Sequence, residues 1–125
     1  MILFLDENMP PRVADALQAL GVVEARHLTK HLPRGTPDEE VFAFLADKDW
    51  LLVTQDERIR RRPHQRQALL AAGVGAFIPT GRADRDVVEM VQFLLGRLDE
   101  MRRLAGSERP FIYGVPDRGR IVRLT

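Results

Sequence analysis

MILFLDENMPP, residues 1–11, joins an apolar run to a short polar stretch and a pair of prolines. Residues 1–5 have the continuous apolar pattern of a strand buried on both faces of a parallel sheet. The two prolines suit the first turn of a helix. At the carboxyl end of the strand lie three polar residues, Asp6, Glu7 and Asn8. Because carboxylates at this position contribute little to folding, we interpret them as part of a functional site.

The alternation of strand and helix continues along the chain. Apolar spacing and proline or glycine boundaries predict helices over residues 11–20, 36–45, 67–72 and 84–104. Short apolar runs predict strands over 1–5, 22–28, 50–54 and 74–79, and a terminal hairpin formed by 111–115 and 120–124. This order predicts an α/β fold with a largely parallel central sheet, helices on both faces and a C-terminal β-hairpin, built as a single domain over residues 1–125.

Two local patterns sharpen these boundaries. Thr36-Pro37-Asp38-Glu39 has the sequence of a capping box, which predicts Thr36 as the N-cap and Glu39 as its reciprocal partner. Residues 57–66, ERIRRRPHQR, are interpreted as a basic break between regular elements.

Composition limits the classes of protein that the chain can represent. A length of 125 residues suits one folded domain without disulfides. The absence of cysteine excludes a disulfide framework and zinc sites built from thiolates, and it fits a reducing compartment. The first apolar run is too short for a signal peptide and no run is long enough for a membrane span, so we expect a cytoplasmic protein without membrane contact.

Three aspartates are predicted to approach one another. Asp6 and Asp56 each follow a predicted parallel strand, and ligands of open α/β sheets bind outside the carboxyl ends of the strands. Asp38, at a helix start, can approach the same edge. Alone, Asp38 is explained by a helix N-terminus and the other two by turns. Together they favour a site that holds Mg²⁺ or Mn²⁺, because crowded carboxylates need a cation and these ions prefer oxygen ligands.

Positive charge is concentrated just after Asp56. Lysine occurs only at positions 30 and 48, so most of the 19 basic residues are arginine, although the net charge is only +1. Arginine favours planar recognition of phosphate. The candidates for nucleic-acid contact are Arg58, Arg60, Arg61, Arg62 and Arg66, together with Arg12 and Arg34. A solvated surface loop is the alternative interpretation of the cluster.

Three motifs carry a resemblance over residues 1–80. LDEN (residues 5–8), G-x-x-D-E-E-V (35–41) and LVTQD (52–56) are similar to the compact PIN-like nucleases grouped with VapC-type toxins. The resemblance implies a PIN-like fold and a Mg²⁺-dependent endoribonuclease, usually the toxin of a type II toxin-antitoxin pair that a cognate antitoxin holds inactive. It further implies catalytic and metal-binding roles for Asp6, Asp38 and Asp56, supported by hydrogen bonds from Asn8 and Thr54.

One position departs from the family pattern. Such families often carry another acid two residues after the last of these aspartates, where this chain has Arg58. Either Glu57 or a later acid such as Asp84 substitutes, or the metal site is weakened. The alternative function is therefore a catalytically weak or inactive PIN-like module that binds RNA or a protein partner. The apolar stripe over residues 87–101 is first a core face, and it leaves open the formation of a homodimer.

Overall fold

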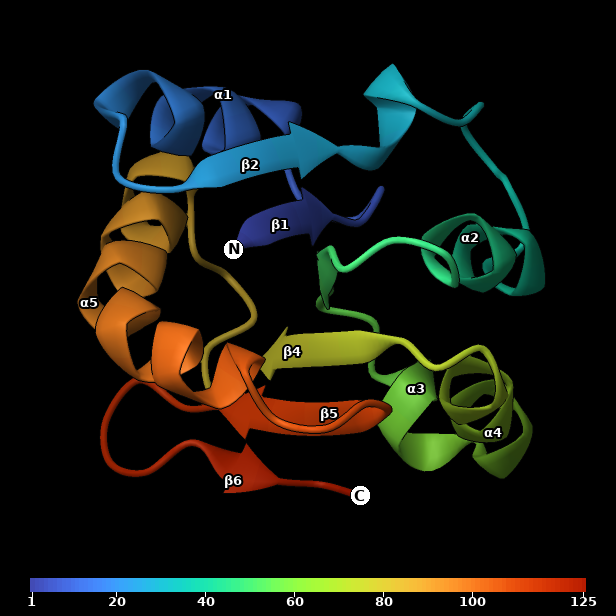
Figure 1. Cartoon of the computed structure of the whole chain (residues 1–125). Coiled ribbons are helices and arrows are strands. Elements are labelled where there is room, and N and C mark those ends of the chain that lie inside the picture. The colour runs from blue at the N-terminus through green and yellow to red at the C-terminus, as the bar shows by residue number, and fades with distance from the viewer.

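The computed structural model describes residues 1–125 and contains one mixed sheet. Its strands are β1 (Ile2–Leu5), β2 (Glu24–His27), β3 (Leu51–Val53), β4 (Gly75–Pro79), β5 (Phe111–Val115) and β6 (Val122–Arg123). They lie in the order β2-β1-β3-β4-β5-β6 (Figure 1). The pairs from β2 to β5 are all parallel and β6 pairs antiparallel to β5. The predicted α/β fold with a terminal hairpin is therefore confirmed.

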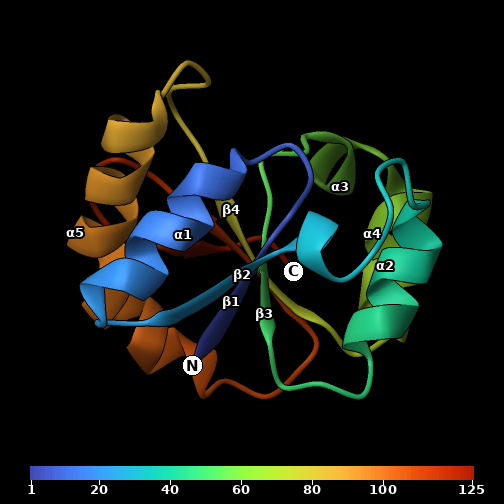
Figure 2. The ribbon, with the colours of Figure 1, turned by 90° about the horizontal axis from the view of Figure 1, so that it is seen from above.

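Helices cover both faces of this sheet. They are α1 (Pro11–Leu20), the short 3-10 helix η1 (Leu28–Lys30), α2 (Asp38–Leu45), α3 (Arg58–Arg61), α4 (Pro63–Ala71) and α5 (Val87–Ala105). Seen from above, α1 and α5 lie on one side of the sheet and α2, α3 and α4 on the other (Figure 2). On each face, a hydrophobic cluster that contains both strand and helix residues packs the helices against the sheet. None of the helices combines the length and apolar character needed to cross a membrane.

The register of the central strands sets the position of the site. Leu5 of β1 pairs with Val53 of β3, so the two strands end at the same level. The backbone N–H of Asp6 donates to the carbonyl of Val53 at 2.9 Å, which extends this pairing by one step. Asp6 and Thr54 therefore leave adjacent strands side by side at the carboxyl edge of the sheet.

The predicted capping box at Thr36 is wrong. The N-cap of α2 is Pro37, which has no side-chain capping bond, and the helix begins at Asp38. The hydroxyl of Thr36 donates instead to the carbonyl of Pro33 at 2.6 Å, so this side chain belongs to a turn that precedes the helix. The capping box of this chain lies at the start of α5, where Asp86 and Glu89 bond reciprocally.

The predicted break over residues 57–66 is also incorrect. This segment forms α3 and the first turn of α4, so the helix expected over 67–72 begins earlier, at Pro63. Proline at the first helical position starts α4 because it lacks an N–H that the helix would leave unpaired. Ile59 and Leu69 are buried under the sheet, which fixes both helices against it.

Gly75 is expected to be indispensable for packing at the start of β4. A Cβ added there would lie 2.6 Å from Cζ of Phe111, a side chain that is itself fully buried. Gly75→Ala should therefore lower the free energy of unfolding by about 1–3 kcal/mol, as overpacked cores do. Urea unfolding followed by circular dichroism measures this change.

Gly96 provides the matched control. It lies within α5, and a Cβ added there would meet no atom within 4 Å. Gly96→Ala should raise the free energy of unfolding by about 0.5–1 kcal/mol, because alanine has the higher helix propensity. Equal stability of Gly75→Ala and the parent chain would contradict the packing described for β4 and β5.

Candidate acidic site

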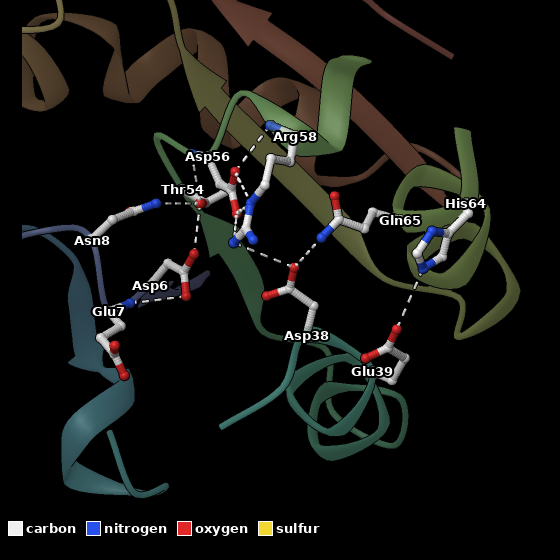
Figure 3. A network of polar contacts seen from close by, with 10 residues as sticks. All are labelled: Asp6, Glu7, Asn8, Asp38, Glu39, Thr54, Asp56, Arg58, His64 and Gln65. Atoms are coloured by element: carbon white, nitrogen blue, oxygen red, sulfur yellow. Dashed lines mark hydrogen bonds and ion pairs between the residues drawn. The ribbon is translucent and has the colours of Figure 1, made fainter. Parts of the chain in front are cut away.

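A polar cleft of about 380 Å³ lies outside the carboxyl ends of β1 and β3 (Figure 3). Its only hydrophobic lining residue is Leu28. Three aspartates from three segments of the chain line it: Asp6 after β1, Asp56 after β3 and Asp38 at the first position of α2. The structure thus brings together the aspartates that the sequence suggested, at the edge of an open α/β sheet where ligands bind.

The hydroxyl of Thr54 organises the base of the cleft. It is fully buried and donates to Oδ2 of Asp6 at 2.7 Å. It also accepts from Nδ2 of Asn8 at 3.2 Å and from the backbone N–H of Asp56 at 3.0 Å. A hydroxyl has one donor and two acceptor positions, so all of its hydrogen-bonding capacity is used. This one oxygen therefore joins the ends of both acid-bearing strands.

Asp56 is held by Arg58. Nε of Arg58 lies 3.0 Å from Oδ1 and 3.1 Å from Oδ2 of Asp56, and Nη2 lies 2.7 Å from Oδ2. Oδ1 also accepts from the backbone N–H of Arg58 at 2.9 Å, at the start of α3. The hydrogen bonds from the guanidinium hold the pKa of Asp56 below its ordinary value.

Asp38 is held by a different group. Nε2 of Gln65, on α4, donates to Oδ2 of Asp38 at 2.9 Å, while Nη2 of Arg58 lies 3.8 Å from the same oxygen. The pKa of Asp38 is raised, first because burial penalises its charged form and second because Asp56 is negatively charged. Gln65 is only 8% exposed, and its Oε1 has no hydrogen-bond partner.

The pKa of Asp6 is also displaced from its ordinary value. Burial raises its pKa above the ordinary value, and the charge of Asp56 adds to this effect. The hydrogen bonds from Thr54 and from the backbone N–H of Glu7 act in the opposite direction without cancelling it. The pKa values of Asp6 and Asp56 are therefore displaced in opposite directions within one cleft, which is common where acids perform chemistry.

The comparison with known families fits this geometry. A model of the PIN-like domain family matches residues 1–81 of the 125. The chain belongs to the PIN-like domain family. PIN-like domains are generally nucleases. Comparisons with curated proteins and with solved structures find no match.

The PIN-like domain contains no group of three or more histidine, aspartate or glutamate side chains arranged to hold a metal ion. The donor chemistry of the cleft nevertheless suits a hard cation, because three carboxylates line it. The guanidinium of Arg58 lies between two of these carboxylates, since it binds Asp56 and is near Asp38. The three aspartates are therefore the type of ligand that a divalent ion takes, but in this arrangement the side chain of Arg58 lies among them.

The other acids near the cleft have different contacts. Glu57, expected from the sequence as a supporting acid that could substitute for the one missing at Arg58, does not line the cleft, and its carboxylate lies 3.6 Å from Arg60 and 3.8 Å from Arg61. Oε1 of Glu7 accepts from the backbone N–H of Gly35 at 2.6 Å and so ties the 31–37 loop to the strand end. The contacts of these two glutamates are thus with neighbouring segments of the PIN-like domain.

The arginines selected from the sequence are dispersed around the domain. Of the seven, only Arg58 lines the cleft, whereas Arg12 and Arg34 do not. Arg60 and Arg66 line a separate hollow beside β5 and the C-terminal segment. Arg62 is exposed and close enough to contribute to the lowered pKa of Asp56.

Sequence reasoning missed Gln65 and His64. His64, at the rim of the cleft, has its Nε2 3.7 Å from Oε1 of Glu39. Both missed residues lie in the first turn of α4, which the sequence interpretation left outside the helix. Counting the helix from Pro63 would place Gln65 four residues before Leu69, so a polar side chain on the buried face was the available signal.

The raised pKa of Asp6 leads to a pH-dependent expectation. The folded protein retains a proton on this carboxyl at pH values where the unfolded chain has lost it, so this group's contribution to stability falls as pH rises above its ordinary pKa. Asp6→Asn should therefore raise the free energy of unfolding at pH 7 by about 0.5–2 kcal/mol. The gain should largely disappear at a pH of about 3.

Urea unfolding at both pH values measures this difference. Asp99→Asn is the control, because the Asp99 side chain on α5 is fully exposed, and it should change stability little at either pH. A loss of stability in Asp6→Asn at pH 7 would mean that the ionised carboxylate stabilises the fold, contrary to this interpretation.

Proposed function

We propose that this PIN-like domain is a metal-dependent endoribonuclease that hydrolyses RNA phosphodiester bonds. The observation that carries the proposal is the convergence of Asp6, Asp38 and Asp56 on one polar cleft at the carboxyl edge of the sheet. The cleft is almost devoid of apolar lining, so it suits a charged ligand better than a hydrophobic one. Family membership supports nuclease chemistry independently of this geometry.

The three aspartates would hold Mg²⁺ or Mn²⁺. These ions take oxygen ligands, and bound to a nuclease they lower the pKa of water and stabilise the charge on phosphate. The roles of the chain's own residues follow from their contacts. Thr54 and Asn8 fix Asp6 at the base of the cleft, and Gln65 fixes Asp38 at its wall. A water activated by the metal ion would make a side-chain nucleophile unnecessary, and the lining contains neither cysteine nor serine.

Beyond the chemistry, we propose that the protein is the toxin of a type II toxin-antitoxin pair. The support is the resemblance of residues 1–80 to compact VapC-type proteins, which implies RNA as substrate and a cognate antitoxin as protein partner. The whole chain would act as one domain, because β5 continues the parallel sheet beyond the matched residues. A second copy of the chain remains a further proposed partner.

An inactive binding module is the second candidate function. The observation in its favour is the ion pair of Arg58 with Asp56, which neutralises one of the three acids inside the cleft. Such a module would bind RNA without cutting it. Cleavage by the purified protein separates the two functions.

Cleavage should require both the metal ion and the aspartates. The purified protein, free of any antitoxin, is incubated with structured and single-stranded RNAs in Mg²⁺ or Mn²⁺, and EDTA should abolish cutting. Asp6→Asn and Asp38→Asn should each lower the cleavage rate by about a hundredfold or more, because removing a metal ligand forfeits several kcal/mol of transition-state stabilisation.

Asp99→Asn is again the matched control, since it removes one exposed carboxylate from α5 and should cut at the parent rate. Cutting that persists in EDTA or in both site variants would point to a contaminating nuclease. Absence of cutting with every RNA by a correctly folded protein would favour the binding module.

The arginine-rich segment should contribute phosphate contacts. Arg62 is exposed and forms no ion pair in the structure, so its charge is free to meet a phosphate. Arg62→Ala should weaken RNA binding on all sequences alike and reduce the slope of log affinity against log salt by about 1. Fluorescence anisotropy at several salt concentrations in EDTA measures both quantities. Arg103→Ala, which removes an exposed arginine from α5, should leave the slope unchanged.

A further inference from the structure

We infer that Arg58 is a built-in competitor of the divalent cation, and that a nucleic-acid phosphate releases it from the cleft. This inference rests on the proposed function, since it concerns the same aspartates. Arg58, which stands where such families often carry an acid, would then have a role of its own in the cleft. The metal ion and the phosphate backbone would then each raise the affinity for the other, because both bind more tightly once Arg58 has left Asp56.

Arg58 occupies the space between two of the aspartates. The guanidinium uses both carboxylate oxygens of Asp56, with N–O distances of 2.7–3.1 Å. Its Nη2 lies 2.7 Å from Oδ2 of Asp56 and 3.8 Å from Oδ2 of Asp38, so a positive charge already occupies the space between these acids. Figure 3 shows the Arg58 side chain extended between the two carboxylates.

The contacts of Arg58 leave no room for a divalent ion on Asp56. Mg²⁺ binds carboxylate oxygens at about 2.0–2.1 Å and requires oxygens that are free to point at it. A guanidinium that binds both oxygens of Asp56 leaves them turned toward nitrogen, and its charge would repel a second cation at this range. Arg58 and a divalent ion therefore cannot share Asp56 in the arrangement observed.

Arg58 is accessible to a competing anion. The Arg58 side chain is 51% exposed, so water screens its ion pair and solvent can reach it. It projects from α3, a helix of only four residues. A phosphate offers the guanidinium the same paired oxygens that a carboxylate does, and arginine binds both groups through two parallel hydrogen bonds. A polyanion entering the cleft can therefore take over the contacts of Arg58.

The other two aspartates have hydrogen-bond partners of their own. Asp6 is held by Thr54 and Asp38 by Gln65, and neither bond involves Arg58. Gln65 lines the cleft and is only 8% exposed, and its Oε1 has no hydrogen-bond partner. A buried acceptor without a partner is uncommon in a folded protein, and here it belongs to the amide whose Nε2 holds Asp38. When Arg58 leaves the cleft, the carboxylates of Asp6 and Asp38 therefore stay in position as oxygen ligands for a metal ion.

Metal affinity tests the inference without reference to catalysis. Isothermal titration with Mn²⁺ is carried out on the parent chain, Arg58→Ala and Arg61→Ala. Arg58→Ala should bind Mn²⁺ about tenfold more tightly, within the usual range for coupled sites. Arg61→Ala removes the same charge from the same helix, but its ion pair is with Glu57 rather than Asp56, and its affinity should match that of the parent. Equal or weaker Mn²⁺ binding by Arg58→Ala overturns the inference.

Two further measurements guard against a variant that fails to fold. Arg58→Gln retains hydrogen bonding without charge and should also bind Mn²⁺ more tightly than the parent. In the unaltered protein, the NMR resonance of the Arg58 Nε–H should shift when saturating Mg²⁺ displaces it from Asp56. An unshifted resonance contradicts the inference.

The outcomes separate this inference from the proposed nuclease. Tighter Mn²⁺ binding by Arg58→Ala without RNA cleavage by any variant would support the competition and reject the nuclease. Metal-dependent cleavage by the parent, with Mn²⁺ affinity unaltered in Arg58→Ala, would support the nuclease and reject the competition.

Discussion

The hydrogen bonds of the Thr54 hydroxyl are the constraint on which the acidic cleft depends. Parallel pairing brings β1 and β3 to the same level, and the hydroxyl then connects the residues that follow each strand. Because the oxygen is fully buried and uses its one donor and two acceptor positions, replacing it would leave several polar groups unpaired. The orientation of Asp6 relative to Asp56 is thus a consequence of sheet register plus one side chain.

Each of the three neighbouring carboxylates in the cleft accepts hydrogen bonds from a different kind of group. Asp6 accepts from a hydroxyl, Asp38 from an amide and Asp56 from a guanidinium. Only the guanidinium brings a charge, so the pKa of Asp56 is lowered while burial keeps those of the other two raised. Of the three acids, Asp56 therefore most strongly favours its ionised form, and it is the one bound by Arg58.

The sequence was sufficient to predict the elements that carry the acids, but not the contacts between them. Continuous apolar runs and paired prolines predict β1 and α1, and parallel strand ends predict that Asp6 and Asp56 meet. The direction of Arg58 was not predictable, because a residue two positions after an acid can point into a cleft or out to solvent. Gln65 was missed for a different reason: its helix was taken to begin four residues too late, which removed it from the buried face.

The segment beyond the family match also supports the site. Leu94 and Leu98 of α5 lie in the same hydrophobic cluster as Leu3, Leu5 and Val53, the residues that anchor the two acid-bearing strands. Asp6 and Asp56 therefore follow strands fixed by a core to which both parts of the chain contribute. Arg58, in contrast, extends from a four-residue helix with half of its side chain exposed. The cleft thus combines acids that follow core-anchored strands with a half-exposed cation, which is the arrangement that exchange of one cation for another requires.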